Sequence, residues 1–303
     1  MFKSLFVRLV FLFLCIVAVD AAAQTQRKIY KGQYHRGKAT PDISLKNISK
    51  NELLTIYGTL GLASYNGDLS GYLWQVGSNS YRPQAGGGVI LRTAYLGKRL
   101  NLRADVRCFR LYSNDVHEGR NLNFRSTNWE FLALGQFDIF PYEKLMRRRT
   151  KINPYVYGGI GLMTYDPWGQ LPNGRWHQLR PLETENVKYG NVAFVYTVGL
   201  GFKYNYSYRW NFMLEAGYRF TTTDYIDDVS SEEYPDPASL QNSISRIMSN
   251  KSFNKSAQTG RGNPKYKDGY AIVSVGLTYT FTRHHATKNR KGGLLDKNLL
   301  RKN

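Results

Sequence analysis

The sequence contains little cysteine, little histidine and few acidic residues. It has two cysteines and five histidines, and its 42 Lys and Arg residues far outnumber its 22 Asp and Glu residues. Cys15 falls in an N-terminal apolar run, so Cys108 alone is expected in the mature chain, which excludes an internal disulfide. No Ser, His and acid spacing typical of hydrolytic catalysis stands out. We therefore expect no enzymatic activity and no cofactor.

Long apolar runs are also absent beyond the first residues. Residues 1–23 combine a basic start, a short apolar core and small residues before Gln24, which is typical of a cleaved signal peptide. No later stretch approaches the roughly 18 apolar residues of a membrane-spanning helix. Export makes nucleic acid an improbable partner despite the formal charge of +20, and leaves acidic proteins or anionic lipid headgroups.

Aromatic residues and glycine are abundant, and many segments alternate between apolar and polar residues. The chain has 23 Tyr and 28 Gly, a mixture that favours many strands on a curved sheet. An exported chain of this kind is either a soluble β-sandwich or an outer-membrane barrel, whose strands need only about ten alternating residues each.

The spacing of the alternating segments favours the barrel. Eight strands are predicted, at about 53–65, 84–95, 100–111, 124–139, 153–165, 194–204, 210–221 and 270–281. We interpret the connections after the second, fourth and sixth strands as short and the others as long, which is the pattern of an up-and-down transmembrane barrel with both termini periplasmic. The expected organisation is a flexible basic arm at 24–51, an eight-stranded antiparallel barrel at 52–282 and a basic tail at 283–303.

The segment 210–221 indicates which face meets lipid. Trp210, Leu214 and Phe220 share one face, and Glu215 and Arg219 share the other. Arg219 facing lipid near the midplane would cost about 2–4 kcal/mol, so the charged face should point into a lumen that side chains fill. The same reasoning predicts a polar lumen network of Arg92, Arg103, Asp105, Arg107, Glu130, Asp138, Lys203, Glu215 and Arg219, with Gln136 beside it.

Specific pairings within that lumen are also expected. Glu215 and Arg219 are about 13 Å apart along a strand, so their partners should come from neighbouring strands rather than from each other. A tight turn after Tyr95 would place Arg92 opposite Arg103, with Asp105 or Glu130 as the shared carboxylate.

Two charged clusters lie outside the strands. Asp224, Asp227 and Asp228 could supply oxygen ligands to calcium, but they lack the spacing and glycine of an EF-hand loop. We favour loop hydrogen bonds and basic neighbours for them, and expect no metal. The cluster Arg147, Arg148 and Arg149 lies at the predicted periplasmic end, where it fits either anionic headgroups or an acidic periplasmic partner.

Four segments carry a family resemblance. "TIYGTLGLASYNGDLS", "NFRSTNWEFLALGQFDIF", "YVYGGIGLMTYDPWG" with the later "LRPLETE", and "GYRFTTTDYIDDVS" appear in this order between Leu54 and Phe281. This arrangement resembles PorG-like proteins, the outer-membrane barrel components of the type IX secretion system. The resemblance implies a non-enzymatic subunit in outer-membrane lipid that ties a periplasmic ring, built from a lipoprotein and its partner, to that membrane. It supplies no catalytic residues and no small-molecule substrate.

Two other hypotheses stay open. The chain could be a general envelope barrel, adhesin-like or membrane-stabilising, whose partners would contact its external loops. It could also be a lipid-modifying barrel enzyme, for which His117 and His177 are the residues to test.

Overall fold

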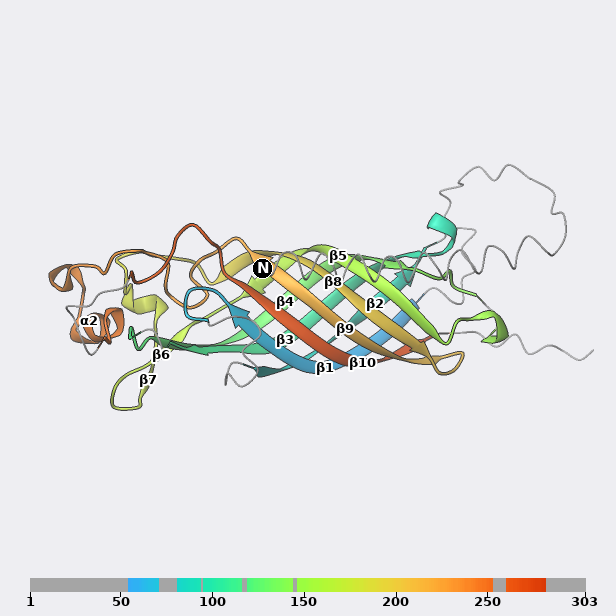
Figure 1. Cartoon of the computed structure of the whole chain (residues 1–303), viewed down its shortest axis with the longest axis horizontal. Coiled ribbons are helices and arrows are strands. Elements are labelled where there is room, and N and C mark those ends of the chain that lie inside the picture. Colours follow the sequence, from blue (N-terminus) through green and yellow to red (C-terminus); the bar gives the residue numbers. More distant parts are fainter. Residues whose placement is uncertain are drawn as a thin grey trace, which may run out of the picture.

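The chain forms a closed antiparallel barrel of eight long strands (Figure 1). The computed structural model describes residues 54–70, 81–93, 95–115, 119–143, 146–252 and 260–281, so the predicted signal peptide, basic arm, basic tail and His117 lie outside the described residues. The barrel strands are β1 (Leu54–Asn66), β2 (Arg82–Arg92), β3 (Leu100–Asn114), β4 (Asn123–Asp138), β5 (Ile152–Thr164), β8 (Val192–Asn205), β9 (Trp210–Thr221) and β10 (Gly269–Thr280).

Each barrel strand pairs with its neighbours in sequence, and β1 closes the barrel against β10, with Leu60 opposite Val275. The predicted fold, an all-β up-and-down barrel, is therefore confirmed. One connection holds the short hairpin of β6 (Trp168–Gln170) and β7 (Trp176–Gln178), in which Trp168 pairs with Arg125 of β4. The other described elements are η2 (Tyr95–Gly97), η4 (Met146–Arg148), η5 (Arg180–Leu182), η6 (Pro237–Ser239) and α2 (Ser243–Ser249).

The two ends of the barrel differ. The β6–β7 hairpin and α2 gather at one end, here called the loop end, whereas the connections 93–99, 139–151 and 206–209 lie at the opposite, turn end (Figure 1). No helix in the described part of the chain is both long and apolar enough to cross a bilayer.

The barrel is polar inside and apolar outside. On β9, Leu214 is 47% exposed, whereas its neighbours Met213 and Glu215 are 3% and 1% exposed. The other strands repeat this pattern, with outward apolar side chains that include Leu60, Leu102, Phe131, Ile160, Val198 and Val275. Burial of the charged face in the interior is what the alternation on this strand predicts, because strand side chains point to opposite faces in turn.

The register of the first hairpin differs from the sequence-based prediction. Ile90, not Arg92, lies opposite Arg103, and Arg92 lies opposite Asn101. The connection is longer than a tight turn, because η2 and three left-handed residues, Leu96, Gly97 and Lys98, occupy it. The shift is by two residues, so every side chain keeps its predicted face.

The expected alternation of loop lengths is also not strict. The connection 139–151, at the turn end, is longer than the connection 115–122 at the loop end. The reason is that β3 and β4 continue their pairing to Asn114 and Asn123, and so convert predicted loop residues into ladder.

Glycines explain the facing of β5, which the sequence left unsettled. Tyr155 and Tyr157 point inward, and both are buried. A side chain at Gly201 would lie 2.4 Å from the Tyr155 ring, and one at Gly199 would lie 2.3 Å from the Tyr157 ring. These two glycines of β8 therefore make the room in which the inward tyrosines lie.

Candidate functional site

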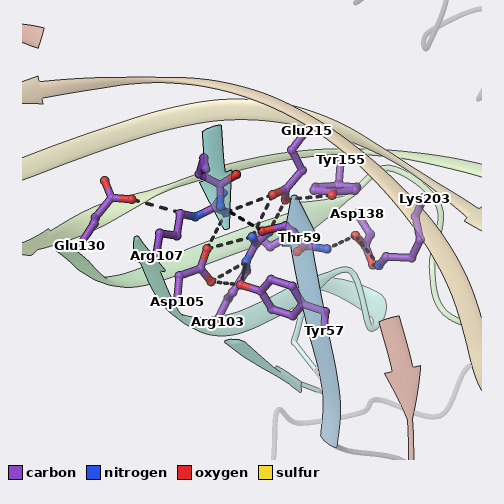
Figure 2. A network of polar contacts seen from close by, with 12 residues as sticks. Tyr57, Thr59, Arg103, Asp105, Arg107, Glu130, Asp138, Tyr155, Lys203 and Glu215 are labelled. Carbon is purple, nitrogen blue, oxygen red and sulfur yellow. Dashed lines mark hydrogen bonds and ion pairs between the residues drawn. The ribbon is translucent and has the colours of Figure 1, made fainter. Parts of the chain in front are cut away.

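A network of paired charges fills the middle of the barrel (Figure 2). Eight predicted lumen residues are buried inside the barrel, and Arg92 is half-buried at the turn end; the eight are Arg103, Asp105, Arg107, Glu130, Asp138, Lys203, Glu215 and Arg219. Three guanidinium groups, from Arg103, Arg107 and Arg219, face three carboxylates, from Asp105, Glu130 and Glu215.

Arg103 is at the centre of this network. Its Nε lies 2.8 Å from Asp105 Oδ1, and its Nη2 lies 3.0 Å from Glu215 Oε2. Arg107 contacts the same two carboxylates, with Nη2 2.9 Å from Asp105 Oδ2 and 3.2 Å from Glu215 Oε2. Tyr57 donates to Asp105, and Tyr155 donates to Glu215 at 2.9 Å. Buried charges of both signs are thus paired and hydrogen-bonded, as burial requires.

The partners of Glu215 and Arg219 come from across the lumen, which corrects the expectation of neighbouring strands. Glu215 on β9 contacts Arg103 and Arg107 on β3, and Arg219 Nε lies 3.5 Å from Glu130 Oε1 on β4. The neighbours of β9 in the barrel are β8 and β10. An eight-stranded barrel is narrow enough for arginine side chains to reach the opposite wall.

A second polar group lies towards the turn end. Lys203 Nζ lies 3.4 Å from Asp138 Oδ2, and Asn101 and Gln136 donate to the same carboxylate at 3.1 and 2.7 Å. The Arg92 guanidinium lies 3.5 Å from the centre of the Tyr142 ring. The lumen is thus occupied by side chains from its centre to this end.

The three turn-end arginines have different surroundings. Arg149 donates from Nε to the Glu143 carbonyl at 2.6 Å and lies over the Tyr142 and Tyr208 rings. Arg147 and Arg148 are exposed, in η4. Arg149 therefore has a structural role in its connection, and Arg147 and Arg148 are the two that present charge to a partner.

At the loop end, two of the segments that carry the family resemblance pack against each other. Asp228 accepts a hydrogen bond from Thr184 at 2.5 Å and another from Tyr189 at 2.5 Å. Glu185 accepts from the backbone N–H groups of Ser230 and Ser231. The "LETE" segment and the "DDVSS" segment thereby form one unit, here called the cap, together with residue Arg261.

Arg261 is the cation of the cap and is 1% exposed. Its Nη1 lies 2.6 Å from Glu185 Oε1, its Nη2 donates to Thr184 Oγ1 at 3.0 Å, and its Nε donates to the Ser249 carbonyl at 3.2 Å. Three loop segments are joined by this one side chain. Sequence reasoning missed it, because a single arginine in a Gly-, Ser- and Asn-rich loop carries no periodic signal.

Asp227 of the cap and Asp268, which directly precedes β10, share a tyrosine; we count Asp268 as part of the cap from here on. The Tyr65 hydroxyl lies 2.6 Å from Asp227 Oδ2 and 2.6 Å from Asp268 Oδ1. A hydroxyl has one hydrogen, so the second contact needs a proton on one of the carboxyls. Burial, together with the charge of each carboxyl's acidic neighbours, raises the pKa of both Asp227 and Asp268 well above the usual range.

The acidic cluster does not form a metal cage in the described part of the chain. No group of three or more His, Cys, Asp or Glu side chains is arranged there to hold an ion. Asp224 instead accepts from the Ser230 hydroxyl at 2.7 Å and lies 3.8 Å from Lys267 Nζ. Its neighbours Asp227 and Asp228 have the hydrogen bonds described above. Each of the three candidate ligands therefore accepts at least one hydrogen bond, from Ser230, Tyr65, or Thr184 and Tyr189.

The barrel is closed, apolar outside, and polar and filled with side chains inside, and these features define a β-barrel of the outer-membrane type. No known protein family matches the sequence, and no curated protein matches it.

Solved structures of similar architecture include three bacterial outer-membrane β-barrels. Neisserial surface protein A is 10% identical, with a TM-score of 0.41, over 75% of this chain and 97% of its own. Ail, the attachment invasion locus protein of Yersinia pestis, crystallised with a heparin analogue, is 10% identical with a TM-score of 0.37, over 76% and 99%. The N-terminal β-barrel domain of Pseudomonas aeruginosa OprF is 10% identical with a TM-score of 0.32, over 77% and 100%.

Proposed function

We propose that this protein is an integral, non-enzymatic barrel of the bacterial outer membrane that acts as an anchoring subunit for a periplasmic assembly, the ring of the type IX secretion machinery. The observation that carries the proposal is the filled lumen. Arg103, Asp105 and Glu215 meet in the centre of the barrel with side chains 0–1% exposed, so the barrel can act only through its outer surface and its two ends.

The membrane location is supported by the outer surface. Aliphatic and aromatic side chains that are about half exposed surround the barrel, among them Leu62, Phe131, Ile160, Phe212 and Val275. Exposed apolar area of this extent is costly in water and favourable in lipid. Aromatic side chains such as Tyr206, Tyr208 and Trp210 cluster towards the turn end, where a girdle at the membrane interface is expected.

The turn end is the side we assign to the periplasmic partner. Arg147 and Arg148 project there from η4, and a lipoprotein ring with an acidic face would complement them. The assignment to type IX secretion rests on the resemblance, and the contact between the "LETE" and "DDVSS" segments supports it, because the residues that carry the resemblance also build one structural unit.

In-cell crosslinking tests the proposal. A photo-reactive residue at position 147 or 148 should capture ring proteins, whereas one at Arg175, which is exposed at the tip of the loop-end hairpin, should not. A clean deletion should block export of secreted cargo, and Arg147→Glu with Arg148→Glu should reduce export while Arg175→Glu leaves it unchanged. Normal export in the deletion strain would end the type IX proposal.

A general envelope barrel is the second candidate, and the ordered cap favours it. Buried ion pairs such as Arg261 with Glu185 hold long loops in one conformation, which suits a surface that binds something outside the cell. Crosslinks from the loop end but none from the turn end would support this alternative.

A further inference from the structure

Three arginines surround one cavity in the barrel wall near the loop end. The cavity has a volume of about 570 Å³, and its lining includes Arg82 of β2, Arg110 of β3 and Arg125 of β4. Arg110 and Arg125 point away from the lumen, because they alternate with the inward residues Phe109 and Phe124. Arg82 shares the strand face of Gln84, but it is the first residue of β2, and its guanidinium lies over the ring of Tyr112, which is on the outward face of β3. The aromatic residues Tyr112, Trp168 and Trp176 complete the walls.

Two of the arginines that line the cavity are held in place by aromatic rings. The Arg82 guanidinium lies 4.2 Å from the centre of the Tyr112 ring, and the Arg125 guanidinium lies 4.1 Å from the centre of the Trp176 ring. Stacking on an aromatic face leaves the edge of a guanidinium, with its N–H donors, free to bind another group. The β6–β7 hairpin supplies two of the walls, which gives this hairpin a role on the outer surface.

Among the described residues, the positive charge around the cavity is not balanced by carboxylates. Its one acidic residue, Asp166, already accepts hydrogen bonds from Trp168 Nε1 at 3.0 Å and Gln178 Nε2 at 2.6 Å, and lies 3.7 Å from Arg180 Nε. Within the described residues, no carboxylate pairs with Arg82, Arg110 or Arg125. Three like charges on one cavity repel one another, and a multivalent anion removes that repulsion.

The position of the cavity identifies the kind of anion. On β4, Arg125 and Thr127 lie directly beyond the outward apolar residues Trp129 and Phe131. On β3, Arg110 follows Val106 and Cys108 in the same way. The arginines therefore lie where the apolar band ends, at the depth of lipid headgroups on the loop-end side of the membrane.

We infer that this cavity binds the phosphate groups of an outer-leaflet glycolipid, with the acyl chains along the apolar band below Trp129. The inference rests on the proposed membrane location with the loop end outward. Two N–H groups of a guanidinium can donate to two oxygens of one phosphate, and the aromatic walls suit the sugar rings to which the phosphates are attached.

Binding of defined lipids to the purified, folded protein in neutral detergent tests the inference. Native mass spectrometry with diphosphoryl lipid A and with its enzymatically dephosphorylated form should show a preference of about tenfold or more for the phosphorylated lipid, the effect of losing one or two charged hydrogen bonds. Arg110→Gln with Arg125→Gln should remove that preference. Arg175→Gln, an exposed arginine of the same hairpin outside the cavity, should keep it.

Three results would overturn the inference: equal binding of both lipids, an unchanged preference in the double variant, or saturation by inorganic pyrophosphate at the same affinity as the lipid, which would indicate a site for soluble anions. A heat-modifiable gel shift confirms that the variants are folded. Labelling of the variant Arg175→Cys at its new thiol in intact cells tests separately whether the loop end faces outward. Labelling from outside together with no preference for the phosphorylated lipid would refute the lipid site but not the outward position of the loop end.

Discussion

Arg103 and Glu215 lie on opposite walls of the barrel and meet in the lumen. Arg103 is on β3 and Glu215 is on β9, and Arg103 Nη2 donates to Glu215 Oε2 at 3.0 Å. Seen around the closed sheet, four strand positions separate them. This contact crosses the full width of the lumen, so it both fills the barrel and ties its two sides together.

Removing one partner of this pair should destabilise the barrel strongly. Glu215→Leu leaves Arg103 and Arg107 with fewer carboxylates in a dry interior, and the expected loss in unfolding free energy is about 3–5 kcal/mol. Urea unfolding of protein refolded into detergent micelles measures it. The double variant Glu215→Leu with Arg103→Met should recover part of the loss, and a double variant no better than Glu215→Leu would contradict a direct pair.

An arginine introduced on the outer wall should lower the free energy of unfolding more, the deeper it lies in the membrane. Two outward residues have similar exposure at different depths along the barrel wall. Leu214 is 47% exposed in the middle of β9, and Val192 is 52% exposed where β8 begins. We expect Leu214→Arg to cost about 2–4 kcal/mol in lipid vesicles and Val192→Arg about 0–1 kcal/mol. Equal costs at the two positions would argue against a membrane around this wall.

The cap should open when its cation is removed, while the barrel stays folded. Arg261→Met leaves the Glu185 carboxylate without its ion-pair partner, which at this burial costs about 3–5 kcal/mol, concentrated in the loops. Limited proteolysis should cut the connection 222–268 much faster in this variant, with an unchanged heat-modifiable gel shift. Arg246→Met changes an exposed arginine of α2 in the same loop and should leave the cleavage rate as it is.

The cap should also tighten in mild acid. Burial raises the pKa of Asp228 to about 6, and the pKa values of Asp227 and Asp268 are raised as well. A carboxyl with a raised folded-state pKa binds more protons in the folded cap than in the open one. Its stabilising effect is therefore complete below the open-state pKa near 4 and is lost as pH rises through the folded-state pKa.

Hydrogen exchange of the cap amides measures this effect. Protection should fall between pH 5 and pH 7 by up to about tenfold per pH unit for each proton released, once intrinsic exchange rates are corrected for. The groups around Asp227 and Asp268 include Asp68 and Asp224, which add negative charge, and Tyr65, which donates to both. Asp227→Asn should weaken the pH dependence, and an unchanged slope would refute the shared proton.

Alternation along the chain was enough to predict the eight barrel strands and the facing of all of them except β5. Leu214 outside and Glu215 inside follow from a period of two and from the cost of charge in lipid. The pairs across the lumen could not be predicted this way. Alternation says that Arg219 points inward, but it does not say that Glu130, three strands away around the barrel, is the carboxylate it reaches.

The loop end was predicted least well, for a physical reason. Its contacts join positions far apart in sequence, as Arg261 joins Thr184 and Ser249, and loops have no repeating pattern that aligns such positions. The resemblance named the "LRPLETE" and "GYRFTTTDYIDDVS" segments without indicating that they touch. The outward arginine cavity was missed for a similar reason, because its three arginines come from three strands and only the sheet register brings them to one place.

The strands that supply the lumen network also determine when the barrel interior can become dry. Tyr57 comes from β1, Arg103 from β3, Glu130 from β4, Glu215 from β9 and Tyr270 from β10, so the partners span the chain from its first strand to its last. A partly assembled sheet leaves these groups in water, where their separation costs little. Water can leave without stranding a charge only when β1 meets β10, so closure of the barrel and dehydration of its lumen are a single event in its assembly.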